Sequence, residues 1–258
     1  IVWSFYRFDH LLRENYLTHA VSQKETGEAH FFSLALHTGE DAGEIVANRR
    51  NLARQLSVDE ASVFISASQT HSSHVRIIDN REMQGWERLE DAVEDCDALV
   101  TDRVNVILTI LTADCVPILL YDPIKRVVAA VHAGWRGTEG EIAIKTIDAM
   151  KHRFGTNPSD ILAGVAPAIG KCCYEVGEDV ASHFFDYRDA MEQYRGKYML
   201  DLPEINKRQM ISSGVREEHI EMSGICTACE VDRYFSYRRE QGCSGRFMSV
   251  IGMRSQYD

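Results

Sequence analysis

One soft or borderline metal ligand lies at the predicted end of a strand in each of three short segments: Gln69-Thr70-His71, Ala113-Asp114-Cys115 and Val131-His132-Ala133-Gly134-Trp135-Arg136-Gly137. Two imidazoles and one thiolate form a ligand set typical of zinc or copper. Three protein ligands leave a coordination position for water or substrate, which is the arrangement of catalytic metal sites. The sequence therefore predicts that His71, Cys115 and His132 form one metal site with a catalytic role.

An acidic residue interrupts the longest apolar run of the chain, which extends from Val104 to Tyr121. A buried carboxylate is costly unless it is paired or hydrogen-bonded, so Asp114 needs a structural or chemical reason for its position. Pro117 follows it, and together the two residues favour a pair of buried strands that meet at a functional turn over a membrane span. We therefore expect Asp114 to be a further catalytic residue beside Cys115.

Candidate substrate-binding residues are Arg49, Arg136 and Glu175. Arg136 follows the glycine turn after His132 and can present a planar fork to phosphate or carboxylate, although it could equally cap a tight turn. Arg49 lies with Asn48 and Arg50 on the side of a predicted helix that we expect to be exposed or to face the site. A second basic stretch is either an anion site or a solvated edge: Ser236-Tyr237-Arg238-Arg239 with Gly245-Arg246.

Seven cysteines are too irregularly spaced for a disulfide framework, so we expect mostly reduced thiols. Cys172 and Cys173 are adjacent and would point to opposite faces of an extended chain, which argues against both serving one site and leaves Glu175 as the better functional candidate there. Cys226 and Cys229 have the spacing of a zinc knuckle. Because no second cysteine pair or paired histidine stands at the matching spacing, the sequence argues against a structural zinc site.

Strands and helices alternate without a strict βαβ rhythm, and no repeat or linker divides the chain. The sequence therefore predicts a single α/β domain over residues 1–258. The expected strands span 61–67, 104–111, 116–121, 127–131, 161–165, 218–223 and 247–251, and the expected helices span 42–56, 142–154, 176–188 and 202–213.

Composition narrows the classes of function. The formal net charge of −11 argues against binding to the phosphate backbone of nucleic acids and favours a small-molecule substrate. No stretch predicts a membrane span or a secretory signal, so the expected location is the cytoplasm. The sequence does not indicate an oligomeric state.

The chain resembles the multicopper polyphenol oxidase (laccase-like) family, whose members are now often described as purine nucleoside phosphorylases and include the laccase-domain protein and peptidoglycan-editing factors. The resemblance runs from about residue 18 to the C-terminus and is most specific at Thr112-Ala113-Asp114-Cys115-Val116-Pro117 and His132-Ala133-Gly134-Trp135-Arg136-Gly137. Further matching segments are Ser33-Leu34-Ala35-Leu36-His37, Asn48-Arg49-Arg50, Gln69-Thr70-His71, Asp97-Ala98-Leu99-Val100-Thr101, Tyr174-Glu175-Val176-Gly177, Cys226-Thr227 and Phe235-Ser236-Tyr237-Arg238-Arg239.

The resemblance implies a layered α/β (α+β) domain with mixed β-sheets flanked by helices, similar to the catalytic domain of cytotoxic necrotizing factor toxins. His71, Cys115 and His132 match the family's metal-binding and catalytic trio, which holds Zn²⁺ and has also been linked to Cu²⁺. Ala35 stands where the family has Asn, and this departure puts one hydrogen bond to substrate in question. Cys229 is not a family feature that the resemblance carries over.

The function implied by the resemblance is metal-dependent phosphorolysis of purine nucleosides. Adenosine, inosine or methylthioadenosine would react with phosphate to give the free base and ribose (or methylthioribose) 1-phosphate, with adenosine deamination as a second activity. Two alternatives remain open. In a cysteine hydrolase of peptidoglycan editing, Cys115 would be the nucleophile and His71 or His132 its base. A copper polyphenol oxidase is less favoured, because the ten histidines include no His-x-His pair.

Overall fold

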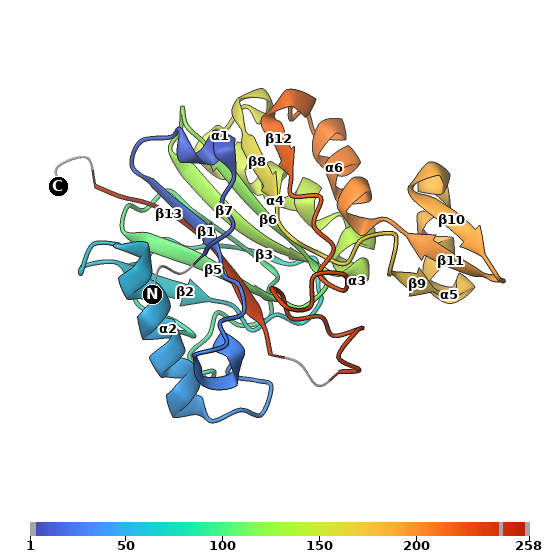
Figure 1. Ribbon diagram of the computed structural model, residues 1–258. Helices are drawn as coiled ribbons and strands as arrows, with labels where there is room; N and C mark the ends of the chain where they lie inside the picture. Colours follow the sequence, from blue (N-terminus) through green and yellow to red (C-terminus); the bar gives the residue numbers. More distant parts are fainter. Residues whose placement is uncertain (1–3, 243–244, 256–258) are drawn as a thin grey trace.

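The computed structural model describes residues 4–242 and 245–255. Two sheets form the centre of the molecule (Figure 1). The first has four strands in the order β1-β13-β5-β2, which are Leu17–Val21, Phe247–Met253, Val106–Thr112 and Val63–Ser66. β13 is antiparallel to both of its neighbours, and β2 is parallel to β5, so the sheet is mixed.

The second sheet has six strands in the order β12-β8-β6-β7-β4-β3, which are Ile220–Met222, Leu162–Val165, Val116–Asp122, Val127–Ala133, Ala98–Thr101 and Val75–Ile77. Its centre is the antiparallel pair β6 and β7, while β12 and β3 add to its two edges in parallel. Every residue of β5, β6 and β7 is buried, because both faces of each strand are covered.

Alternate side chains of the central strands serve two different cores, as the two-residue period of a strand requires. On β7, Val128 and Ala130 face the four-stranded sheet, whereas Ala129 and Val131 face the helices. Helices α4 (Ile142–Phe154) and α6 (Leu202–Ser212) cover that outer face. Helix α2 (Ala42–Leu56) covers the outer face of the four-stranded sheet. The result is a layered α/β sandwich.

The remaining elements are short. A third sheet of β9 (Glu175–Val176), β10 (Met191–Tyr194) and β11 (Lys197–Leu200) projects from one side of the sandwich with α5 (Glu178–Ala181) (Figure 1). The other short helices are α1 (Asp9–Leu12), α3 (Trp135–Glu139), η1 (Ala29–Phe32), η2 (Pro158–Asp160), η3 (Ser182–Ala190) and η4 (Glu217–His219). None of the described helices is long and apolar enough to cross a membrane.

The predicted fold class, a mixed α/β domain with helices flanking the sheets, is confirmed, and helices 42–56 and 142–154 have the predicted bounds. The Asp41 carboxylate accepts the N–H of Glu44 and so fixes the start of α2. The predicted helix over 176–188 is wrong. The segment contains the end of β9, the four-residue α5 and then η3, whose backbone is non-helical at Phe184 and Tyr187. Val176, Ala181 and Phe184 are buried in the core, and this tertiary packing overrides the helical periodicity.

Candidate metal centre

The connections from β2 to β3 and from β5 to β6 both cross between the two sheets at the same end of the sandwich, and each carries one of the predicted ligands. His71 lies in the connection from β2 to β3, and Cys115 is the last residue of the tight connection from β5 to β6. His132 is the penultimate residue of β7 and pairs with Pro117 at the start of β6. The ligand atoms of these three residues lie within 4.8 Å of one another, as metal ligands must.

Asp97, which precedes β4, orients the imidazole of His132 and holds the backbone at His71. Its fully buried carboxylate lies 2.7 Å from Nδ1 of His132 and also accepts the backbone N–H groups of Thr70, His71 and Ser72 at 3.2, 3.1 and 2.7 Å. With Nδ1 occupied by the carboxylate, Nε2 of His132 is the nitrogen left to face Cys115. A carboxylate behind a histidine is the usual second contact of a metal-ligating imidazole.

Two residues of this site have a left-handed backbone conformation. His71 has φ of 60° and Asp114 has φ of 92°, in the left-handed region that residues with a Cβ rarely adopt. Gly134 provides space on the other side, because a Cβ there would lie 3.0 Å from Cδ2 of His71 and 3.1 Å from Sγ of Cys115. The close approach of the three ligand side chains therefore depends on a glycine at the end of β7.

Charges at the centre are coupled. Burial alone would raise the pKa of Cys115, but hydrogen bonds and charge from His132 and His71 lower it to about 6. Burial alone would lower the pKa of His132, but the Cys115 thiolate and Asp97 raise it to about 9. The thiol and the imidazole therefore stabilise each other's charged forms, a thiolate on Cys115 and an imidazolium on His132. A thiolate is the form of cysteine that binds metals and attacks electrophiles.

A cavity of about 610 Å³ opens over the three ligands, a size suited to a small molecule. Three aromatic side chains, those of Trp135, Tyr174 and Tyr237, contribute to its wall. The cationic residues Arg238 and Arg246 also line it. The cavity thus combines a soft ligand cluster, flat apolar surfaces and two cations.

Asp114 lines the same cavity, and its charge is hydrogen-bonded as its burial required. One carboxylate oxygen accepts the hydroxyl of Thr227 and the other accepts the backbone N–H of Arg238, each at 2.7 Å. Its carbonyl accepts the N–H of Ile169 at 2.8 Å. These contacts join three distant segments of the chain around the cavity, so the structure gives Asp114 a positioning role; direct participation in catalysis stays a prediction.

The structure does not bring Arg49 to the cavity. The side chain is 1% exposed, and its guanidinium donates to the carbonyls of Leu34, Gly85 and Trp86 at 2.8, 2.6 and 2.8 Å. The expectation that this side of α2 is exposed or faces the site is therefore wrong for Arg49, and also for Asn48, which is 2% exposed. Both side chains hold helix α2 against neighbouring segments through hydrogen bonds to backbone carbonyls.

Arg136 and Glu175 also lie outside the cavity wall. Arg136 is exposed and stacks on Trp135, with its guanidinium carbon 4.3 Å from a ring centroid. The Glu175 side chain is exposed on β9, and its carbonyl accepts Nη1 of Arg238 at 2.8 Å. The orienting role of Asp97 was not predicted from the sequence. The feature of the sequence that could have indicated this role is the position of an acidic residue directly before the buried strand 98–101.

Mixed sheets packed face to face, with a His-Cys-His cluster at one end, define a class of α/β domain with a candidate metal centre. The family described as multi-copper polyphenol oxidoreductase laccase matches residues 18–254, and this chain belongs to that family.

Similar proteins carry the names of two activities. Purine nucleoside phosphorylase YlmD of Bacillus subtilis is 36% identical over 225 residues, covering 85% of this chain and 81% of that protein. Adenosine deaminase RL5, from an unknown prokaryotic organism, is 37% identical over 226 residues, covering 85% and 86%. The crystal structure of YlmD from Geobacillus stearothermophilus superposes with a TM-score of 0.90 at 32% identity, covering 98% of this chain and 99% of that one.

Proposed function

We propose that this protein is a metal-dependent purine nucleoside phosphorylase that cleaves adenosine, inosine or methylthioadenosine with phosphate. The observation that carries the proposal is one cavity that holds the His71-Cys115-His132 cluster together with Arg238 and Arg246. Phosphorolysis needs a cationic place for phosphate and stabilisation of the departing base, and this cavity offers residues for both. Relatives named purine nucleoside phosphorylase give the same indication.

The reaction transfers the sugar from nitrogen to oxygen. A phosphate oxygen forms a bond to C1′ of the ribose as the bond from C1′ to the purine nitrogen breaks, and the electron pair of that bond leaves with the base. Arg238 and Arg246 would hold phosphate by charge-assisted hydrogen bonds. The aromatic faces of Trp135 and Tyr174 would bind the purine or sugar by stacking and burial.

His71, Cys115 and His132 suit a zinc ion, since their ligand atoms converge, the thiol ionises readily and Asp97 fixes the His132 tautomer. A bound zinc ion would supply a Lewis acid for the departing base or for activating water. Copper remains the second candidate ion, because the same donors bind it. Adenosine deamination as a second activity is supported by the relative named adenosine deaminase.

A cysteine hydrolase is the second candidate function, favoured because Cys115, His132 and Asp97 follow one another in the site. This order of thiol, imidazole and carboxylate is that of a nucleophile, its base and a group that orients the base. Polyphenol oxidation is supported by the family's description alone. The six described cysteines are free, which suits a reducing compartment such as the cytoplasm.

Chromatography of reaction products separates these functions. Adenosine, inosine and methylthioadenosine are each incubated with metal-analysed protein, with and without phosphate. Phosphorolysis predicts free base and sugar 1-phosphate only when phosphate is present, and inosine formed from adenosine without phosphate would reveal deamination. Base release that does not depend on phosphate, or no conversion of any nucleoside, would contradict the proposal. In the second case muropeptides would be the next substrates.

A further inference from the structure

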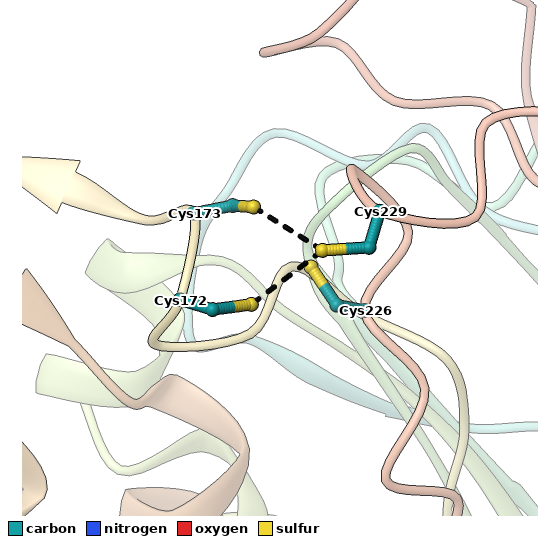
Figure 2. A group of neighbouring side chains, drawn as sticks. All are labelled: Cys172, Cys173, Cys226 and Cys229. Carbon is teal, nitrogen blue, oxygen red and sulfur yellow. Dashed lines mark hydrogen bonds between the residues drawn. The ribbon is translucent and has the colours of Figure 1, made fainter.

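A second cluster of potential ligands lies outside the candidate metal centre. Cys172 and Cys173 come from the turn that follows β8, and Cys226 and Cys229 come from the turns that follow β12. Figure 2 shows the four side chains pointing toward one another from these two loops. All four sulfur atoms lie within 4.8 Å of one another, with 3.7 Å from Cys172 to Cys229 and 3.5 Å from Cys173 to Cys229.

The prediction that Cys172 and Cys173 cannot share a site is wrong. It assumed an extended chain, on which adjacent side chains point apart, but residues 170–173 form a turn. The N–H groups of Cys173 and Tyr174 both bond to the carbonyl of Gly170, at 2.9 and 3.0 Å. The turn directs Cys172 and Cys173 to the same side, so this adjacent pair supplies the second pair of cysteines that the spacing in the sequence did not reveal for Cys226 and Cys229.

The sulfur spacing suits a single tetrahedral ion. With Zn–S bonds of about 2.3 Å, tetrahedral geometry places sulfur atoms about 3.8 Å apart, close to the two separations given above. A disulfide would bring two sulfurs to about 2.05 Å, and the four cysteines are free thiols. Four sulfur donors around one point are typical of zinc or iron, and four protein ligands leave no open position.

Both loops are held in place independently of any ion. The backbone of Ala168 pairs with the second loop, donating to the carbonyl of Ile225 at 3.3 Å and accepting the N–H of Thr227 at 3.0 Å. The N–H of Gly170 donates to Sγ of Cys226 at 3.3 Å. Such a donor stabilises a negatively charged sulfur, which is the form that binds a metal. The cluster is therefore prearranged rather than a chance meeting of flexible side chains.

We propose that Cys172, Cys173, Cys226 and Cys229 hold a structural zinc ion, distinct from the ion at the candidate metal centre. The ion ties the loop at 170–174 to the loop at 225–230. Tyr174 lines the cavity, and Thr227 donates its hydroxyl to Asp114. The structural zinc ion therefore fixes two parts of the cavity wall without contacting substrate. The proposal for this ion does not depend on which reaction the cavity carries out.

Elemental analysis of the full chain, purified under reducing conditions without chelator, tests the proposal. We expect two zinc ions per wild-type chain and a loss of one in Cys229→Ser. Cys115→Ala is the matched control, which removes a thiol from the other cluster and should lose the other ion. One zinc per wild-type chain, lost in Cys115→Ala but retained in Cys229→Ser, would overturn the proposal, as would iron in place of the second zinc.

A second measurement uses the wild-type chain, so it does not depend on a variant that folds. Cobalt added to metal-depleted protein should give the visible and thiolate charge-transfer bands of a tetrahedral four-sulfur site, in addition to weaker bands from the site with one sulfur. Intact mass under non-reducing, denaturing conditions should match six or seven free thiols after alkylation. Absence of the four-sulfur spectrum, or a mass short of two alkyl groups with the disulfide mapped to Cys229, would contradict a zinc site.

Discussion

The Asp97 carboxylate lies 2.7 Å from Nδ1 of His132 and accepts the backbone N–H of His71 at 3.1 Å. One buried acid therefore sets the position of two of the three candidate ligands. It turns Nε2 of His132 toward Cys115 and holds the strained loop that presents His71. The geometry of the centre depends on a residue that need not touch metal or substrate.

Asp97→Asn should weaken metal binding at the candidate centre, because an amide can adopt the orientation that supports the wrong imidazole tautomer. We expect a loss of about 10–100-fold in zinc affinity, with a parallel loss of activity at limiting zinc. Competition with a chromophoric chelator measures the affinity. The control is Asp95→Asn, which changes a nearby exposed carboxylate that bonds to Thr70. Unchanged zinc affinity in Asp97→Asn would contradict the role of Asp97.

Arg246→Ala and Arg238→Ala should weaken the binding of phosphate more than that of nucleoside, since both side chains line the cavity. A charge-assisted hydrogen bond contributes about 1.5–3 kcal/mol, which predicts a rise of roughly tenfold or more in KM for phosphate. Initial rates at varied phosphate and saturating nucleoside measure this effect. Arg239→Ala is the matched control, because Arg239 does not line the cavity. An equal effect in all three variants would refute a phosphate-binding role.

Arg49→Met should destabilise the fold and leave substrate binding intact. The change leaves three buried carbonyls without their donor and removes the contact of the guanidinium with Trp86. We expect the free energy of unfolding to fall by about 3–5 kcal/mol, measured by urea denaturation. Arg50→Met, at the neighbouring exposed ion pair with Glu87, should change it by less than about 1 kcal/mol. Normal stability with a raised KM would restore Arg49 as a substrate-binding residue.

Because of the buried His19, the folded protein should be less stable in mild acid than at neutral pH. Burial, with the nearby charge of Arg7, lowers the pKa of His19 to about 4, and neutral Nε2 accepts the N–H of Phe8 at 2.9 Å. Below about pH 6.5 the unfolded state binds this proton and the folded state does not. The free energy of unfolding is therefore undiminished above that pH and falls as the pH drops from about 6.5 to 4. Between pH 7 and 5 the loss is about 2 kcal/mol.

Urea unfolding at both pH values tests the role of His19. His19→Gln keeps a hydrogen-bond acceptor but cannot titrate, so its stability should depend less on pH in this range. His152→Gln, an exposed histidine on α4, is the control and should behave like the wild type. The same pH dependence in His19→Gln as in the wild type would show that other groups cause it.

The features that the sequence could predict are those that depend on residues close together along the chain. The bounds of α2 and α4 depend on apolar periodicity within one segment, and the sequence was sufficient for both. The three ligands of the candidate centre were recognisable because each ends a short, distinctive segment. Asp97, Arg238 and Arg246 gain their positions from contacts between segments remote in the chain, which no local pattern encodes. The four-cysteine cluster was missed for a related reason, because one turn at Gly170 reverses the expected direction of Cys173.

Transfer of isotopically labelled phosphate oxygen to the sugar is the most direct measurement of phosphorolysis at the candidate metal centre. Inosine is incubated with ¹⁸O-labelled phosphate and zinc-loaded wild-type protein, and the products are weighed by mass spectrometry. Phosphorolysis at this centre predicts ribose 1-phosphate that retains all of the labelled oxygens, formed in equal amount with hypoxanthine, and no product with His71→Ala or Cys115→Ala. Unphosphorylated ribose as the product, or undiminished transfer in both variants, would contradict it.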